Sequence, residues 1–128
     1  MDRAETGRLG EQAACGYLRE RGYLIRELNW RSGHDEIDII AERFDQIRFV
    51  EVKTRRAGGL TAPEDALDNA KSRNMLRAAS RYMALHAVSA EPHFDLAAVD
   101  AEPDGSFSVR YFEDAVTPHW RRPSRRRR

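Results

Sequence analysis

The sequence predicts a single domain of the mixed α/β class, with a central sheet of about five strands and a helix on each face. Three observations predict it. The 128 residues match the usual size of one domain. The 41% of hydrophobic residues suffice for one core. Segments with helical and strand periodicity follow one another in the order helix, three strands, helix, two strands.

Two segments have helical spacing of their apolar residues. The first covers about residues 3–21, where Asp2 followed by Glu5 forms the pattern of a capping box and Gly22 is the expected C-cap. The second covers about residues 63–86 and opens with a proline and two acidic residues, which suit a helix N-terminus. Both are long enough to cover one face of a sheet.

Five segments have the composition of strands, and short polar or glycine-containing stretches separate them. The connection between the third strand and the second helix contains two adjacent glycines, so a mobile loop is expected over residues 55–61. The expected strands are residues 23–31, 36–41, 47–53, 94–100 and 107–111.

Charge is unevenly distributed along the chain. The net charge is +1, but six arginines lie within residues 121–128, which leaves 16 basic and 21 acidic residues in 1–120. We therefore expect an acidic folded domain over residues 1–120 and a disordered arginine-rich tail over 121–128. Such a tail attracts polyanions, above all nucleic acid, although a solvated tail without a role is the alternative.

Several classes of protein are excluded by composition. No run of about 18 apolar residues predicts a membrane span, and the charged N-terminus does not resemble a signal peptide. A cytoplasmic location is therefore expected. The single cysteine, Cys15, excludes an internal disulfide and a cysteine-cluster zinc site, and the four histidines lack ligand spacing.

Two carboxylates lie within apolar strand segments. A turn centred between residues 44 and 45 would place Asp38 opposite Glu51, and Glu36 opposite Lys53. Like charges directly opposite each other destabilise a sheet unless a cation lies between them, and carboxylate oxygens suit Mg²⁺ or Mn²⁺. The hairpin therefore predicts a site for a divalent metal.

Two further residues complete this pattern. Lys53 follows Glu51 by two residues and projects from the same face, where an ammonium group can orient or activate a water molecule. Glu11 lies on the helix stripe of Ala14 and Leu18, so it can reach the same cluster from the helix. Each residue alone is more often solvent-facing, but the combination is much rarer.

At this point the sequence resembles a known family. The spacing Asp38…Glu51-x-Lys53 resembles the PD-(D/E)xK nuclease signature, and about residues 5–115 resemble the YraN-like family of small bacterial proteins, which is similar to archaeal Holliday junction resolvases. The segments that carry the resemblance are Gly7-x-x-Gly10-Glu11-x-x-Ala14, Asn29-x-Arg31, Glu36-Ile37-Asp38-Ile39-Ile40, Phe49-Val50-Glu51-Val52-Lys53-Thr54-Arg55, Lys71 and Phe94-Asp95.

The resemblance implies a restriction-endonuclease-like fold and a metal-dependent nuclease site. It implies that Asp38 and Glu51 ligate Mg²⁺ (or Mn²⁺) with the backbone carbonyl of Val52, that Glu11 is an accessory acid, and that Lys53 is the catalytic lysine. Two positions depart from the family pattern. Asp35 stands where the family typically has glycine, and Glu36 stands where the signature has proline.

Basic residues near the expected site are candidates for binding nucleic acid. Guanidinium groups match phosphate oxygens in two-point contacts. A solvated helix face is the alternative for the arginines of the second helix. The candidates are Arg31, Arg55, Arg56, Lys71, Arg73 and Arg77, together with Arg125, Arg126, Arg127 and Arg128 in the tail.

Three functional hypotheses follow. The first is a metal-dependent endonuclease that hydrolyses phosphodiester bonds in DNA, with branched or structured DNA as a candidate substrate. The second is a nucleic-acid-binding module with a nuclease-like fold and little or no catalytic activity. The third is a protein-interaction domain that pairs through an exposed strand edge, with a homodimer as one form.

Overall fold

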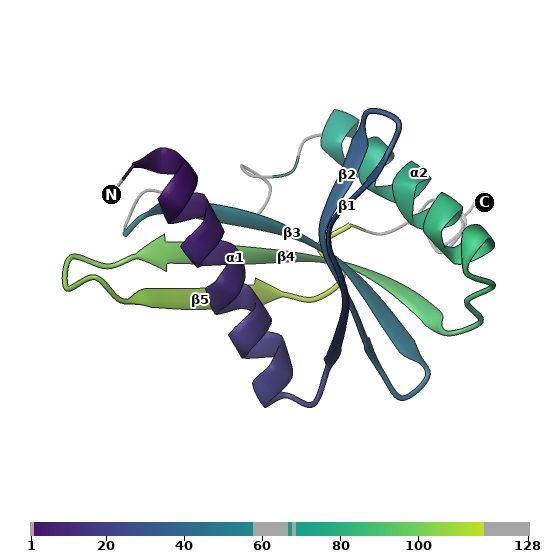
Figure 1. The fold of residues 1–128 in the computed structure, drawn as a ribbon, viewed down its shortest axis with the longest axis horizontal. Helices are drawn as coiled ribbons and strands as arrows, with labels where there is room; N and C mark the ends of the chain where they lie inside the picture. The colour runs from purple at the N-terminus through teal and green to yellow at the C-terminus, as the bar shows by residue number, and fades with distance from the viewer. Residues whose placement is uncertain (1, 58–66, 68, 117–128) are drawn as a thin grey trace, which may run out of the picture.

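The computed structural model describes residues 2–57, 67 and 69–116, and the elements follow the predicted order (Figure 1). The predicted helix over 63–86 is corrected at its start, because Leu67 is not helical and the helix begins at Asn69. The predicted loop over 55–61 is also corrected, because Arg55 and Arg56 still belong to the third strand. The two adjacent glycines, residue 63 and the arginine-rich tail lie outside the described residues. The elements are α1 (Arg3–Glu20), β1 (Leu24–Ser32), β2 (Asp35–Arg43), β3 (Gln46–Arg56), α2 (Asn69–Leu85), β4 (Glu91–Ala101) and β5 (Phe107–Phe112).

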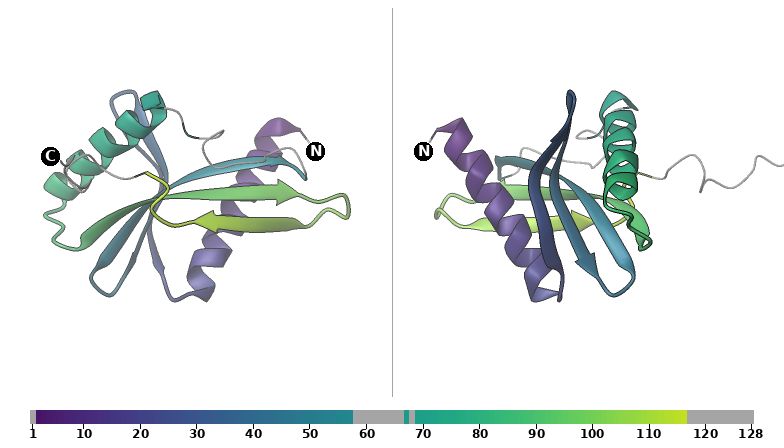
Figure 2. Two further views of the ribbon diagram at one scale, coloured as in Figure 1. Left: turned by 180° about the vertical axis from the view of Figure 1, so that it is seen from behind. Right: turned by 45° about the vertical axis from the view of Figure 1, so that its right-hand side comes forward.

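The sheet is mixed, as predicted, and its spatial order equals its chain order, β1-β2-β3-β4-β5. β3 and β4 are parallel, and every other neighbouring pair is antiparallel. The parallel pair requires a crossover, which contains α2. The helices cover opposite faces of the sheet (Figure 2). This arrangement is consistent with a restriction-endonuclease-like fold.

Each helix packs over its own hydrophobic cluster. Under α2, Met75, Ala78 and Tyr82 pack on Ile40 and Phe49 of the sheet. Under α1, a second cluster forms around the buried Ala14, Cys15, Leu18, Ile39 and Val50. Neither helix of the described ranges is long and apolar enough to cross a membrane.

The ends of α1 confirm the predicted caps. The Asp2 side chain accepts a hydrogen bond from Glu5 N at 2.8 Å. At the other end, Gly22 has a φ of +88° and its N–H donates to Arg19 O, while Tyr23 N donates to Leu18 O. This pair of bonds is the Schellman motif, in which glycine takes the left-handed conformation that a side chain disfavours.

The β1–β2 hairpin is twisted at Asp38. The ladder with β1 includes Leu28↔Ile39 and Trp30↔Ile37 but no pair at Asp38, and its expected partner Asn29 has a φ of +52°. Residues two apart on a regular strand share a face. Here, however, Ile37 packs under α2 and Ile39 packs under α1. The hairpin therefore turns over at this level, and its tip lies against α2 (Figure 1).

This twist corrects the predicted strand register. The pairs from Arg43↔Gln46 to Ile39↔Val50 follow the predicted register, but the β2–β3 ladder ends there. The predicted pairs Asp38–Glu51 and Glu36–Lys53 are wrong, because β2 leaves β3 at Asp38 to follow the turned hairpin. The sheet consequently forks at this point, and β3 continues with β4 alone on one side.

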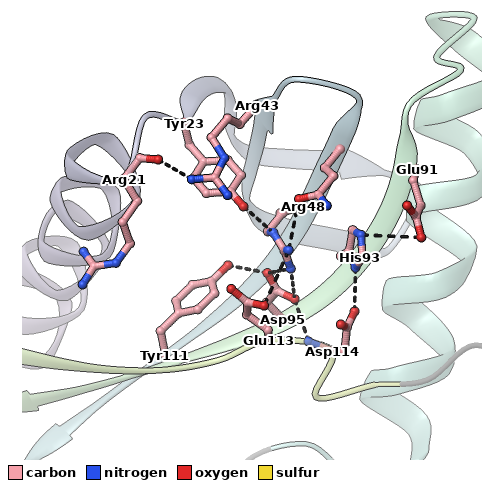
Figure 3. A network of polar contacts seen from close by, with 11 residues as sticks. Arg21, Tyr23, Arg43, Arg48, Glu91, His93, Asp95, Tyr111, Glu113 and Asp114 are labelled. Atoms are coloured by element: carbon pink, nitrogen blue, oxygen red, sulfur yellow. Dashed lines mark hydrogen bonds and ion pairs between the residues drawn. The ribbon is translucent and has the colours of Figure 1, made fainter.

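A buried polar network stabilises the end of the sheet away from the fork (Figure 3). Arg48 and Asp95 are 4% and 0% exposed. The Arg48 guanidinium donates to both Asp95 oxygens, at 3.2 and 3.1 Å, and to the Tyr23 hydroxyl at 2.7 Å. Asp95 also accepts from the Tyr111 hydroxyl and from Asp114 N. Buried charges persist only when they are paired in this way.

Candidate functional site

A groove of about 1340 Å³ lies beside the fork. Its walls are the N-terminal half of α1, the final residues of β3 and the β4–β5 turn, which lie close together in Figure 1. Residues 51–57 line it without interruption. A strand seen face-on would contribute alternate residues. β3 therefore presents its edge to the groove, because β2 no longer pairs with it there.

Asp38 lies at the fork and bridges it. Its Oδ2 accepts a hydrogen bond from Val52 N at 2.8 Å, so the carboxylate takes the place of a ladder acceptor. Burial raises the pKa of Asp38 to about 7, and the Glu51 carboxylate adds to the increase. The Val52 bond opposes it, and Glu11 and Glu36 repel more weakly. Burial and the neighbouring carboxylates therefore both disfavour the charged form of Asp38.

Glu51 projects from β3 into the same place and contacts a cation of α2. Lys71 Nζ lies 2.6 Å from Glu51 Oε2. The Glu51 side chain is 16% exposed and that of Lys71 is 42% exposed. Lys71 is one of the predicted candidates on the second helix, and the structure places it at the site.

Glu11 reaches the groove from α1, as its helix stripe predicts. Its Oε1 accepts a hydrogen bond from Asn29 Nδ2 at 3.2 Å. Burial raises the pKa of Glu11, the Asn29 hydrogen bond opposes this, and the charges of Glu36 and Glu51 add to it. Asn29, the residue of β1 with the left-handed conformation, thus also positions Glu11 of α1.

Three basic residues of β3 line the groove next to the carboxylates: Lys53, Arg55 and Arg56. None of them forms an ion pair with another residue of the described ranges. Carboxylates therefore gather at the fork, and the final residues of β3 form a more basic end of the groove, which Glu102 also lines.

Three further predicted arginines, Arg31, Arg73 and Arg77, do not line the groove. Arg31 is exposed and pairs with Glu36 at 3.6 Å, and Arg73 is exposed on α2. Arg77 donates to both oxygens of Asp35, at 2.8 and 3.0 Å. The four arginines of the tail lie outside the described residues.

Asp35 explains one departure from the family pattern. It is 5% exposed at the hairpin tip and accepts from Arg77 and also from Arg81, at 3.2 Å. The Arg77 hydrogen bond lowers the pKa of Asp35. This clamp fastens the turned hairpin to α2, the helix that carries Lys71. This role of Asp35 has no local signal in the sequence, because its partners Arg77 and Arg81 are 42 and 46 residues away.

The carboxylates at the fork are potential ligands of a metal ion. Within the described ranges, no three side chains of His, Cys, Asp or Glu stand close enough together to hold a metal. Asp38 and Glu51 supply two hard carboxylates instead. Mg²⁺ is usually bound by one or two carboxylates, with water and substrate phosphates completing its shell. The residues present therefore fit Mg²⁺ better than a metal that needs a full protein cage.

Comparison with known proteins identifies the family. A family model described as "Uncharacterised protein family UPF0102" matches residues 10–99, which include all the carboxylates of the site. The chain belongs to the UPF0102 family. A UPF0102 protein of Bacteroides thetaiotaomicron is 42% identical over 114 residues, covering 89% of this chain and 93% of the relative.

Two further UPF0102 relatives have similar sequence identity to this chain. One from Porphyromonas gingivalis is 42% identical over 105 residues, covering 82% of this chain and 78% of its own length. One from Oleidesulfovibrio alaskensis is 47% identical over 98 residues, covering 76% of this chain and 48% of its own length. The UPF0102 match supports the predicted YraN-like resemblance.

Proposed function

We propose that this UPF0102 protein is a metal-dependent endonuclease of the PD-(D/E)xK type that hydrolyses phosphodiester bonds in DNA. One observation carries the proposal. Asp38 of β2, Glu51 and Lys53 of β3, and Lys71 of α2 all line one groove at a fork in the sheet. Two partly buried carboxylates beside two lysines suit phosphoryl chemistry better than a structural ion pair.

Asp38 and Glu51 would hold Mg²⁺ (or Mn²⁺), with the backbone carbonyl of Val52 as a further ligand and Glu11 as an accessory acid. When bound, such an ion polarises a phosphoryl oxygen and lowers the pKa of an attacking water molecule. Burial is the main cause of the raised pKa of Asp38, and repulsion by Glu51 adds to it; a cation between the two carboxylates would remove that repulsion.

Other residues would bind and orient the substrate. The Lys53 ammonium would orient the attacking water or stabilise charge on the phosphate. Arg55 and Arg56 would contact the DNA backbone further along the groove, since guanidinium forks match phosphate oxygens. The arginine-rich tail would add attraction that does not depend on sequence. Cleavage of a branched substrate at two symmetric positions would require a homodimer.

A second candidate is a nucleic-acid-binding module without turnover. The Lys71–Glu51 ion pair favours it, because Lys71 already neutralises one of the two carboxylates. In that case the fork would be a structural site, and the basic end of the groove would hold the nucleic acid.

The test is cleavage of labelled single-stranded, duplex, flap and four-way-junction DNA, and of RNA, with Mg²⁺, Mn²⁺ or EDTA. We expect metal-dependent cutting of DNA that falls by at least about 100-fold in Asp38→Asn and in Lys53→Ala. Arg73→Ala, on the exposed face of α2, is the matched control and should cut normally. Salt-sensitive binding without cutting by the wild type would favour the binding module.

A further inference from the structure

Lys71 contacts Glu51, one of the two carboxylates that would hold the proposed metal ion. It is the third residue of α2 and reaches across the fork to Glu51 Oε2, at 2.6 Å. This distance is at the short end for a charge-assisted hydrogen bond. Within the described ranges, Lys71 is the one cationic side chain in ion-pair contact with Asp38 or Glu51.

Lys71 shares its surroundings with several carboxylates. Lys71 lines the large groove together with Glu36, Asp38 and Glu51, and the same four residues line a smaller pocket of about 200 Å³ on the side of α2. Lys71 thus lines both hollows together with three carboxylates, one of which, Glu51, its ammonium group contacts. A divalent ion at this position would neutralise these carboxylates with twice the charge of the lysine.

The two cations compete for the same oxygen. An ammonium group bound to Glu51 Oε2 blocks that oxygen from an ion that approaches it to about 2.0–2.1 Å. Lysine has a long flexible stem, and this side chain is partly exposed, so it can leave without unfolding the helix. Once released, its ammonium group remains beside the groove, where a DNA phosphate would lie.

We propose that Lys71 is an internal counter-ion of Glu51 that metal binding displaces, and that the displaced ammonium group then contacts the DNA backbone. This inference rests on the proposed metal site but adds a separate property to it. Apo protein keeps the site closed by an ion pair, and metal loading both opens the site and creates a phosphate contact.

The test is calorimetric titration of Mg²⁺ and of Mn²⁺ into the full chain at low salt. Lys71→Met keeps the apolar stem and removes the charge, and it should bind the metal about three- to tenfold more tightly. Arg73→Met is the matched control. It removes one positive charge two residues away on the same helix, and it should change the affinity less than twofold.

A second measurement distinguishes the release of Lys71 from Glu51 from simple repulsion between the lysine and the metal ion. DNA binding is measured with Ca²⁺ as a non-hydrolytic metal and again with EDTA. Lys71→Met should weaken binding about three- to tenfold with Ca²⁺ and less than twofold with EDTA, because the wild-type lysine is occupied by Glu51 in the absence of metal. Equal weakening in both conditions would overturn the displacement step.

The outcomes distinguish this inference from the proposed function. Equal metal affinity of wild type and Lys71→Met would overturn the counter-ion role and leave the metal site standing. Weaker binding by Lys71→Met would also overturn it, since Lys71 would then support the metal. If neither protein binds metal, both the inference and the proposed nuclease site are wrong. Binding by Lys71→Met alone would support the inference in its strongest form.

Discussion

Gly10 of α1 and Thr54 of β3 lie so close together that no larger residue fits at position 10. A Cβ atom on Gly10 would stand 1.9 Å from Thr54 Oγ1 and 2.9 Å from both Thr54 Cβ and Cγ2. Because Thr54 is β-branched, its side chain cannot rotate away from all three contacts. This approach brings α1 onto β3 and sets Glu11 beside the groove.

We therefore predict that Gly10→Ala destabilises the protein by about 1–3 kcal/mol, because α1 must move away from β3. Gly7→Ala is the matched control, since no atom lies within 4 Å of its added Cβ and alanine favours the helix by about 0.5–1 kcal/mol. Urea unfolding of both variants measures the difference. Equal stability of the two would contradict the close approach.

The hairpin clamp predicts a pH dependence. The pKa of Asp35 is lowered below 3.8 in the folded state, so its contribution to stability is present at neutral pH and is lost as the pH falls below about 4. Asp35→Asn should therefore lower the unfolding temperature at pH 7, and the difference from wild type should shrink at pH 3. Arg77→Gln should behave similarly, and Arg73→Gln should not. A gap that is unchanged at pH 3 would argue against the ion pair.

Asp38 predicts the opposite dependence. The folded carboxyl keeps its proton up to about pH 7, whereas the unfolded one releases it near 3.8. The free energy of unfolding therefore falls as the pH rises between these values. Asp38→Asn removes this loss and should be more stable than wild type at pH 8 in EDTA. The gap should vanish below pH 4.

Metal should reduce this difference. Mg²⁺ in the millimolar range should raise the unfolding temperature of wild type at pH 8 and leave Asp38→Asn unchanged, because a ligand stabilises only a folded state that binds it. Thermal unfolding, monitored by circular dichroism, measures the unfolding temperatures of wild type and Asp38→Asn with EDTA and with Mg²⁺. An Asp38→Asn variant less stable than wild type in EDTA would show that the Asp38 charge is already compensated.

The buried network around Asp95 predicts that the Tyr111 hydroxyl contributes to stability. Tyr111→Phe removes a donor from the buried Asp95 and should cost about 1–3 kcal/mol. Tyr17 stacks on Tyr111, with ring centroids 5.0 Å apart, and its hydroxyl has no hydrogen bond within the described chain. Tyr17→Phe should therefore change stability by less than about 0.5 kcal/mol. Chemical denaturation measures both, and similar costs would be inconsistent with a donor role for Tyr111.

The arginine-rich tail predicts a salt effect. Deleting residues 121–128 removes six positive charges, so the slope of log affinity for DNA against log salt should become shallower. Filter binding over a range of salt concentrations gives the slope. Replacement of the six arginines by glutamine keeps the length and serves as the control for charge. A slope that neither change alters would refute a role for the tail in binding DNA.

Local patterns were enough to predict much of the fold. The cap at Asp2, the order of elements and the β2–β3 register up to Ile39 all depend on residues near one another in the sequence. The hairpin twist was not predictable in this way. It depends on a left-handed Asn29 opposite Asp38, and most asparagines in strands do not adopt that conformation.

The structure brings several of the predicted residues together, but with a geometry that differs from the predicted strand pairing. Glu11, Glu51 and Lys53 line the groove. They could be selected from the sequence because a charged residue within an inward-facing pattern is a strong signal. The fate of the arginines was less predictable, since Arg77 looks solvated in sequence but is held by Asp35. Likewise Asp95 lies in a segment that the family resemblance includes, but its partner Arg48 is 47 residues away.

The parallel pairing of β3 with β4 has a consequence for synthesis on the ribosome. α1 and the first three strands are complete once Arg56 has emerged, but β4 does not begin until Glu91. Until then the central strand of the future sheet is an edge strand, with Phe49, Val50 and Val52 on it. Exposed apolar edges of this kind pair with other chains. The nascent protein is therefore most vulnerable to aggregation during the translation of its crossover helix.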